Sequence, residues 1–346
     1  MISLAALRWL SKHNIPVFFL DFDGAIISSI LPPTPVKADL RAAQFQASND
    51  SQKKLTIAKA LVQAKIARSI QVLDWLAERY DIEQQVRMAK AEAEKLSKAA
   101  TVPETRTVEG RTALRYWETF KKILPEWLHF QGRMTTSHNN NASDPFNATL
   151  NYGYGFLKIE CRIAVNTIGL EPAVGFLHEI ASAQTAESLV YDLEEPFRFL
   201  ADLCVIQAFE SGMLRPQDFA FTRDDYLYRI QWDGRMRLRD SLKEAFNSGV
   251  NYRGRMLKWD TVIEQKTLEL GRFLTGKSPS IDFSDPVPSL ERIDSKAMRE
   301  KILSLTQSEA SDLGIGKSTL HYLREKARER SSFKLYENVK RKLLDG

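Results

Sequence analysis

Apolar residues recur every three or four positions through much of this chain, and this helical spacing limits the possible folds more than any other feature of the sequence. The clearest run consists of Ile57, Leu61, Ala64, Ile66, Ile70, Leu73 and Leu76. Such spacing places the apolar side chains on one face of a helix. We therefore predict helical structure from Lys37 to about Ala100, including a charged, alanine-rich helix over residues 86–100.

A short β element is predicted ahead of these helices. Residues 4–13 have the pattern of an amphipathic helix, and residues 17–20 and 25–30 have that of two strands joined by an Asp21-Phe22-Asp23-Gly24 turn. No repeated strand–helix–strand pattern follows. The expected fold class is mainly α with a small N-terminal β element, an α+β arrangement.

The rest of the chain is predicted to be helical with a few interruptions. Helices are expected over residues 111–124, 148–168, 189–211 and 241–274. Between them we expect a break at 102–110, a polar loop at 137–146, and a β-hairpin at 226–239. Asp233-Gly234 is the predicted two-residue turn of that hairpin. Residues 278–290, with three prolines, are predicted to be a linker.

The composition excludes several classes of protein. Apolar residues make up 43% of the chain and charged residues 27%, whereas glycine and proline together contribute only 29 of 346 residues. These values are typical of a globular protein and not of a collagen-like or disordered one. No apolar run approaches the ~18 residues that a membrane span needs. Because Cys161 and Cys204 are isolated in the sequence, we expect no disulfide and a cytoplasmic protein without a membrane partner.

Charge is distributed unevenly along the chain. Residues 295–346 contain 12 Lys or Arg and 7 Asp or Glu, so this segment accounts for the net charge of +5 of the whole chain. Residues 171–218 contain nine carboxylates and only two cations. A basic tail favours polyanions, and a carboxylate-rich segment favours metal ions. An enzyme that acts on nucleic acid through a metal ion would have both.

The basic tail has the pattern of a helix-turn-helix between Thr306 and Leu323. Ala310 is small enough for two helices to approach, Gly314 suits the turn, and Leu320 would anchor the second helix. The second helix would present Lys317, Thr319 and Arg324 to phosphates and base edges of DNA. The alternative is a solvated helical hairpin without a ligand, and the excess of positive charge favours the DNA-binding interpretation.

A candidate metal site can be assembled from the acidic segment. His178 lies between two predicted helices, and Asp192 and Glu195 are three residues apart, on one face of a helix. Pro196 either kinks this helix or marks the first turn of a helix. Glu160 lies on the preceding long helix. Taken together these side chains suit Mg²⁺ or Mn²⁺, whereas taken singly each could be an ordinary carboxylate or a core histidine.

The turn in the N-terminal β element has a competing interpretation. A hydrophobic strand followed by Asp21-Phe22-Asp23-Gly24 also occurs in haloacid-dehalogenase-like phosphatases, in which the first aspartate is a nucleophile. That fold needs repeated βαβ units, which the following helices do not provide. An acidic hairpin turn is the preferred interpretation.

Three sequence blocks resemble a known family. They are Asn147-Ala-x-Leu-Asn151-Tyr-Gly-Tyr with Glu160, then Gly175-Phe-Leu-His178-Glu179, then Asp192-Leu-x-Glu195-Pro-Phe-Arg198. In this order they resemble the CRISPR-associated integrases and endonucleases of spacer acquisition, the Cas-one family. The C-terminal helix-turn-helix is similar to an extension of some archaeal members and of casposases, their transposon-borne relatives.

The resemblance implies a division of the chain and a set of ligands. Residues 1–36 would be an N-terminal β domain, truncated relative to the family, through which two copies form a homodimer. Residues 37–285 would be the α-helical, metal-dependent catalytic domain, and residues 286–346 the linker and helix-turn-helix. Glu160, His178 and Glu195 would bind Mg²⁺ or Mn²⁺, with Asp192 as a supporting catalytic carboxylate. Glu194 matches no fixed position of the family.

The activity implied is cleavage of DNA and its insertion by phosphodiester transesterification. The partners would be double-stranded and branched DNA and, in some members, the small Cas-two protein. Arg198, Arg235, Arg237, Arg253 and Arg255 are candidate phosphate contacts. Two alternatives stay open at this point: a casposase of the same family, and a non-catalytic helix-turn-helix DNA-binding regulator.

Overall fold

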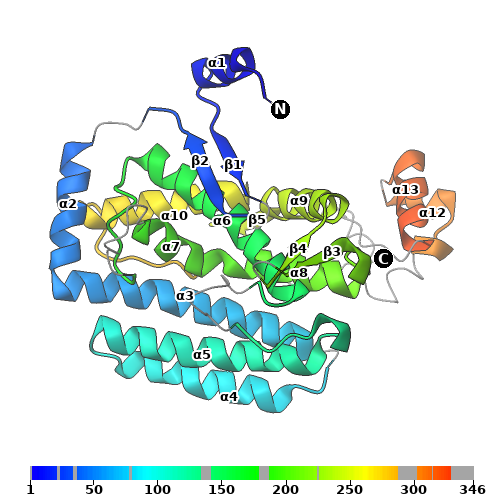
Figure 1. Ribbon diagram of the computed structural model, residues 1–346, viewed down its shortest axis with the longest axis horizontal. Coiled ribbons are helices and arrows are strands. Elements are labelled where there is room, and N and C mark those ends of the chain that lie inside the picture. Colours follow the sequence, from blue (N-terminus) through cyan, green and yellow to red (C-terminus); the bar gives the residue numbers. More distant parts are fainter. Residues whose placement is uncertain are drawn as a thin grey trace. The chain divides into compact units, whose positions relative to one another are not determined.

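The computed structural model describes residues 2–21, 24–33, 37–77, 80–133, 142–178, 187–223, 226–286, 302–313 and 315–328. These residues form two units (Figure 1). The first unit contains residues up to 208 and residues 215–288, and the second contains residues 209–214 and the residues from 289 onward. We describe each unit by itself.

The N-terminal part of the first unit is the predicted β element. Helix α1 (Leu4–Lys12) is capped by the side chain of Ser3 and buries none of its residues. Strands β1 (Val17–Leu20) and β2 (Ile26–Ile30) pair antiparallel. Gly24 lies in the turn between them with a φ of 89°, a conformation that favours glycine.

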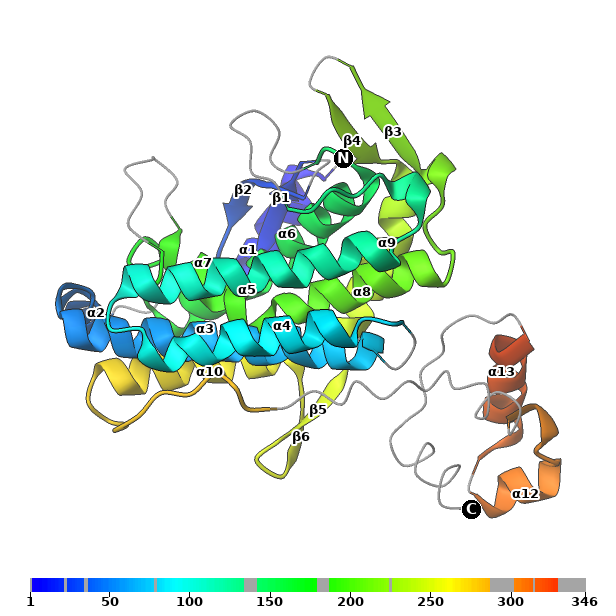
Figure 2. The same ribbon diagram turned by 90° about the horizontal axis from the view of Figure 1, so that it is seen from below.

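A group of four helices follows. It consists of α2 (Ala38–Asn49), α3 (Ser51–Ala77), α4 (Glu83–Ala93) and α5 (Val102–Ile123). Helices α3, α4 and α5 lie side by side (Figures 1 and 2). The apolar residues whose spacing predicted α3 are buried in it, among them Ile57, Leu61 and Leu73.

The predicted break at residues 102–110 is wrong, because these residues form the first half of α5. The Thr101 side chain accepts a hydrogen bond from the backbone N–H of Glu104, which satisfies a donor of the first turn. Pro103 lies in that same turn, where a missing N–H costs nothing. Gly110, the other residue that suggested a break, is accommodated within the helix.

The centre of the first unit is helix α6 (Pro145–Ile168), which packs against α7 (Ser188–Glu194) and α10 (Trp259–Leu274). Asp144 caps the start of α6, and Gly169 ends it in a left-handed conformation with φ of 87°. Pro196 lies in a 3-10 turn, Glu195–Phe197, between α7 and α8 (Arg198–Glu210). The expected interruption at Pro196 is therefore present, as a 3-10 turn between two helices.

The predicted hairpin at residues 226–239 is wrong, because the hairpin of this region lies earlier in the sequence. Strand β3 (Phe219–Thr222) pairs with β4 (Leu227–Ile230), and Asp233-Gly234 lies in the first turn of helix α9 (Trp232–Phe246). Asp233 is stabilised there by the positive end of the helix dipole. Leu238, Leu242 and Phe246 recur every four residues and form the buried face of α9.

A further hairpin interrupts the helix that was predicted over residues 241–274. Strands β5 (Gly249–Tyr252) and β6 (Arg255–Lys258) pair across a turn at Arg253-Gly254. Both turn residues have positive φ, at 51° and 80°, as a type I′ turn requires. Residues 278–286 form neither helix nor strand, and the rest of the predicted linker lies outside the described residues.

The second unit contains α12 (Gln307–Asp312) and α13 (Lys317–Arg328). Thr306 and Glu309 form a capping box at the start of α12. Ala310 and Leu320, the residues predicted to join the two helices, are buried together with Ile302, Leu305, Ile315, Leu323 and Ala327. Gly314, the predicted turn residue, is outside the described residues.

The fold class is thus confirmed as mainly α with small β elements. The sheets within the described residues are three separate antiparallel pairs of strands, so this part of the chain lacks the parallel sheet that the phosphatase interpretation requires. Among the same residues, no helix is long and apolar enough to cross a membrane.

Candidate metal-binding and DNA-processing site

Asp192 organises the segment that carries His178. Its carboxylate is fully buried and accepts hydrogen bonds from the backbone N–H groups of Phe176, Leu177 and His178 at 2.5, 3.0 and 2.8 Å. Its Oδ1 also lies 2.7 Å from His178 Nδ1. A carboxylate at Nδ1 holds the proton on that nitrogen and leaves Nε2 as a free electron-pair donor.

Glu195 presents its carboxylate to the same imidazole. The Oε1 atom of Glu195 lies 3.9 Å from His178 Nε2, and the residue is 4% exposed. Arg198 approaches Oε1 at 3.1 Å, and Lys65 approaches Oε2 at 2.6 Å. Burial favours the protonated acid, but Arg198 and Lys65 outweigh it and lower the pKa of Glu195 to about 2. Glu195 is therefore a carboxylate at neutral pH.

Lys65 and Glu109 are parts of this site that the sequence did not reveal. Lys65, on α3, forms ion pairs with both Glu195 and Glu109 of α5, so one cation joins three elements. Burial opposes the charge of Lys65, but the two carboxylates raise its pKa. A lysine between Ala64 and Ile66, two residues of the predicted apolar face, is the one sequence signal that could have found it.

Glu160 occupies a different environment. It is largely buried on α6, and this burial, together with the nearby charge of Asp260 on α10, raises its pKa to about 7. Across the described ranges, no three His, Cys, Asp or Glu side chains are grouped closely enough to hold a metal ion. The structure places His178 next to both Asp192 and Glu195, but it does not group Glu160 with them as a further ligand.

Glu194 is a second buried carboxyl group beside this cluster. It is 3% exposed, and burial raises its pKa to about 8. Its Oε1 has no hydrogen-bond partner among the described residues. Burial is the largest cause that raises the pKa of the Cys161 thiol, and the negative charges of Glu194 and Glu160 raise this pKa further. Both carboxyl groups therefore lie near the contact of α6 with α7.

The donor atoms of the cluster fit a small divalent cation. Two ligands of one Mg²⁺ lie roughly 3 to 4 Å apart, given metal–oxygen distances of ~2.1 Å. The 3.9 Å between His178 Nε2 and Glu195 Oε1 falls in that range. An imidazole nitrogen and carboxylate oxygens are donors that Mg²⁺ or Mn²⁺ accept.

Arg198 connects the cluster to a buried network of aromatic hydroxyl groups. Its guanidinium lies 4.9 Å from the ring centroid of Tyr154. The hydroxyl groups of Tyr154 and Tyr116 donate to the two oxygens of buried Asp202 at 2.6 and 2.9 Å. Arg198, which was predicted to contact DNA, is thus held by Glu195 and Tyr154.

The other predicted DNA contacts lie on several elements. In the first unit, Arg237 pairs with Asp218 at 2.6 Å, Arg235 lies over the ring of Trp232, and Arg255 is exposed on β6. In the second unit, Lys317 and Thr319 are exposed on α13, whereas Arg324 donates to the carbonyl of Leu305. Arg237 and Arg324 therefore have structural partners, and Arg255, Lys317 and Thr319 are accessible.

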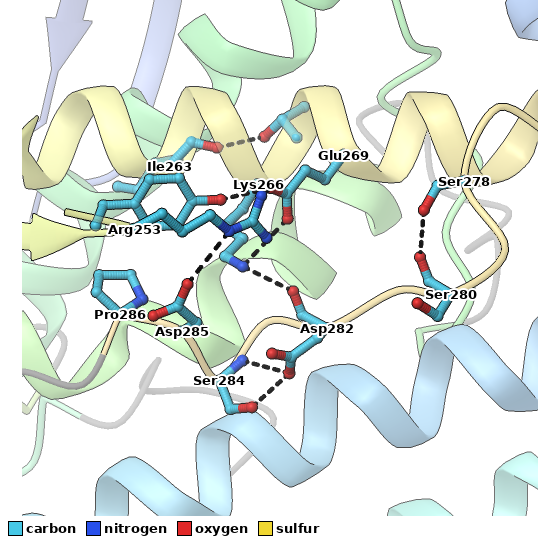
Figure 3. Close-up of polar contacts among 12 residues, drawn as sticks. Arg253, Ile263, Lys266, Glu269, Ser278, Ser280, Asp282, Ser284, Asp285 and Pro286 are labelled. Carbon is cyan, nitrogen blue, oxygen red and sulfur yellow. Dashed lines mark hydrogen bonds and ion pairs between the residues drawn. The ribbon is translucent and has the colours of Figure 1, made fainter. Parts of the chain in front are cut away.

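Arg253 belongs to a network that holds residues 278–286 against other parts of the first unit (Figure 3). It pairs with Glu269 at 2.7 Å and with Asp285 at 3.5 Å. Lys266, which is completely buried, pairs with Glu269 and donates to the carbonyl of Asp282 at 2.9 Å. Arg68 of α3 donates to the carbonyls of Ser284 and Pro286. This network fastens the segment to α3 and α10.

Comparison with known proteins shows the family of this chain. The family model of CRISPR-associated protein Cas1 matches residues 1–244 of this chain. The chain belongs to the Cas1 family. Among curated Cas1 proteins, a CRISPR-associated endonuclease Cas1 of Archaeoglobus fulgidus is 31% identical over 294 residues, which cover 80% of this chain and 84% of the relative.

Solved structures of Cas1-family proteins have the same fold. A casposase bound to its integration product is 38% identical, with a TM-score of 0.80, and the match covers 87% of this chain and 83% of the casposase. A chain of a Cas6-RT-Cas1–Cas2 complex is 22% identical with a TM-score of 0.69, covering 83% of this chain and 31% of that one. The second likeness concerns the fold alone.

Proposed function

We propose that this Cas1-family protein is a divalent-metal-dependent DNA integrase. The observation that carries the proposal is the pairing of an Asp192-held imidazole with a buried, ionised Glu195 at 3.9 Å. This pairing occurs in a chain that is 38% identical to a casposase bound to its integration product. The sequence motifs support Glu160 as the third ligand of Mg²⁺ or Mn²⁺.

In this proposal the reaction is a transesterification. The 3′-oxygen of an incoming DNA end forms a bond to a target phosphorus, the bond from that phosphorus to the target 3′-oxygen breaks, and the proton of the attacking hydroxyl passes through solvent to the leaving oxygen. A bound Mg²⁺ or Mn²⁺ would act as a Lewis acid on the phosphate. Asp192 keeps the proton on His178 Nδ1, and Lys65 and Arg198 keep Glu195 ionised.

Of the two integrase types, we favour the casposase. The casposase likeness is 38% identical, compared with 31% for the Cas1 endonuclease of Archaeoglobus fulgidus. The two-helix second unit, with Lys317 and Thr319 exposed, would contribute DNA binding in such an enzyme. A spacer integrase remains the second candidate because the family model is that of CRISPR-associated Cas1.

The test is a strand-transfer assay with full-length protein, a supercoiled plasmid and labelled DNA ends, in Mn²⁺, in Mg²⁺ and in EDTA. We expect metal-dependent joining that is lost in Glu160→Ala and His178→Ala, while the affinity for DNA changes little. Joining that prefers ends with terminal inverted repeats supports a casposase, and insertion into a repeat array supports a spacer integrase. DNA binding without any joining would leave only the DNA-binding regulator.

Two further partners belong to the same proposal. A homodimer through the N-terminal element would cover Leu4, Trp9 and Ile27, which are 71, 57 and 67% exposed. A Cas2 partner is suggested by the complex whose Cas1-containing chain has a similar fold. Sedimentation of the protein alone, and then with a Cas2 protein added, tests both partners.

A further inference from the structure

The β3–β4 hairpin carries a row of aromatic rings on one face. Phe221 and Tyr228 are cross-strand partners with ring centroids 5.1 Å apart, and Tyr226 lies 6.3 Å from Phe221. At the other end of the row, Phe219 lies 6.2 Å from Trp127. Since alternate residues of a strand share a face, the row extends from Trp127 toward the turn of the hairpin.

The end of this row near the turn is open to solvent. Phe221 is 47% exposed and Tyr226 is 71% exposed. Tyr226 has a φ of 54°, a left-handed conformation that an aromatic residue rarely adopts. Trp232, which follows β4 at the start of α9, is 65% exposed. Rings this exposed add little to the stability of the fold, and backbone strain beside them is typical of a binding site.

Arginines accompany these rings. Residues 219–239 contain five arginines and three aspartates. The guanidinium of Arg235 lies 5.6 Å from the ring centroid of Trp232, and Arg223 is exposed at the end of β3. Aromatic rings interleaved with arginines are the combination that binds single-stranded nucleic acid, because bases stack on the rings and the cations attract the backbone. An apolar docking site for a protein would be poorer in charge.

We propose that Phe221 and Tyr226 form a stacking surface for unpaired bases of the DNA end. The proposal rests on the integrase function above and names where the end is held. A duplex hides the faces of its bases, so exposed rings select an unpaired strand. Glu195 is only 4% exposed, so a single strand can approach its carboxylate more closely than a bulkier duplex can.

The experiment measures DNA affinity in EDTA by fluorescence anisotropy, so that it does not depend on catalysis. It compares a forked duplex that has a 3′ oligothymidine arm with a blunt duplex of equal length. The double variant Phe221→Ala/Tyr226→Ala is expected to bind the forked DNA about fivefold to a hundredfold more weakly, since each stacked base contributes on that scale. Its affinity for the blunt duplex should be unchanged.

Two controls separate stacking from other effects. Phe45→Ala removes a ring that is 48% exposed on α2, outside the hairpin, and should leave the preference for forked DNA intact. Phe221→Leu/Tyr226→Leu keeps the surface apolar but removes the π faces. It should lose the forked preference as the alanine variant does, with unchanged thermal unfolding.

Three results would overturn the proposal: unchanged affinity for forked DNA in the alanine variant, equal weakening for both DNAs, and a change confined to the sedimentation coefficient, which would indicate a protein-docking surface. A failure of strand joining in the wild-type protein refutes the integrase instead. In that case the forked preference and its loss in the variants would still support the stacking surface.

Discussion

At the scale of single residues, Lys65 is one of the two cations, with Arg198, that keep Glu195 ionised. It lies between Glu109 and Glu195 and is 15% exposed. Removing one partner of a buried ion pair leaves an uncompensated charge, which costs about 3–5 kcal/mol. Lys65→Met should lower the free energy of unfolding by about that amount, as measured by urea denaturation.

Lys90→Met is the matched control for this prediction. Lys90 pairs with Asp74 at 2.8 Å, but both side chains are 48% exposed. Exposed pairs contribute about 0–1 kcal/mol, so this variant should unfold almost as the wild type does. Similar losses in the two variants would contradict the role assigned to Lys65. Lys65→Arg, which keeps the charge, should recover part of the stability.

The raised pKa of Glu160 should make the stability of the protein depend on pH. Its pKa rises from 4.5 to about 7 on folding, so between these values the folded chain retains a proton that the unfolded chain has released. The free energy of unfolding therefore falls as pH rises through that interval, by up to about 3 kcal/mol at ~1.4 kcal/mol per pH unit. In metal-free buffer, Glu160→Gln should make the fall smaller by that amount, while the fall due to the raised pKa of Glu194 stays, and the variant should melt at a higher temperature than the wild type at pH 8.

Asp260→Asn is a second variant that tests the raised pKa of Glu160. Asp260 is the charge that adds to burial in raising the pKa of Glu160. Its removal should lower the pKa and reduce the decline in stability between pH 4.5 and 7, without abolishing it, because burial remains. A decline over this interval that is equal in the wild type and in Glu160→Gln would show that Glu160 ionises normally.

Residue motifs predicted part of the candidate site. His178, Asp192 and Glu195 were named from the sequence because their blocks resemble a family, and the structure brings them together. Glu109 could not be named, because a buried ion pair between distant helices leaves no local pattern, and the one signal for Lys65 was its position within a predicted apolar face. Glu160 as a third ligand stays a prediction.

At the scale of elements, we expect a glycine-to-alanine substitution to have opposite effects on stability at two positions. A Cβ added to Gly155 of α6 would collide with the backbone of Gly24 in the β1–β2 turn. Backbone atoms cannot rotate away as a side chain can, so Gly155→Ala should destabilise the protein by about 1–3 kcal/mol, the usual range for overpacking. Thermal and urea unfolding would measure this effect.

Gly110 of α5 is the control, since a Cβ there would meet nothing within 4 Å. Alanine is favoured over glycine within a helix by about 0.5–1 kcal/mol. Gly110→Ala should therefore stabilise the protein. If Gly155→Ala also stabilised it, the close approach of α6 to the first hairpin would be refuted.

The elements themselves were predictable where the apolar period was long and unambiguous, as in α3. The errors arose at short segments. Asp233-Gly234 is a strong turn signal, but the buried face formed by Leu238, Leu242 and Phe246 makes the segment a helix. The turn at Arg253-Gly254 was missed because its positive φ at an arginine has no sequence signature.

At the scale of the whole molecule, the second unit predicts how DNA binding responds to salt. Lys317 is exposed at the first position of α13. If it contacts a phosphate, Lys317→Ala should reduce the slope of log affinity against log salt concentration by about 1. Lys53→Ala on α3 is the control with an exposed lysine outside this unit. Equal slopes in the wild type and the Lys317 variant would remove Lys317 from the interface.

The anchoring of residues 278–286 also has a practical consequence. Because Arg68 and Lys266 grip the backbone of this stretch, the chain is firmly held up to Pro286, near the end of the first unit. Residues inserted directly after it would lengthen the connection by at most ~3.6 Å each and leave the core packing untouched. This position is thus a natural junction for grafting a different DNA-binding module onto the enzyme.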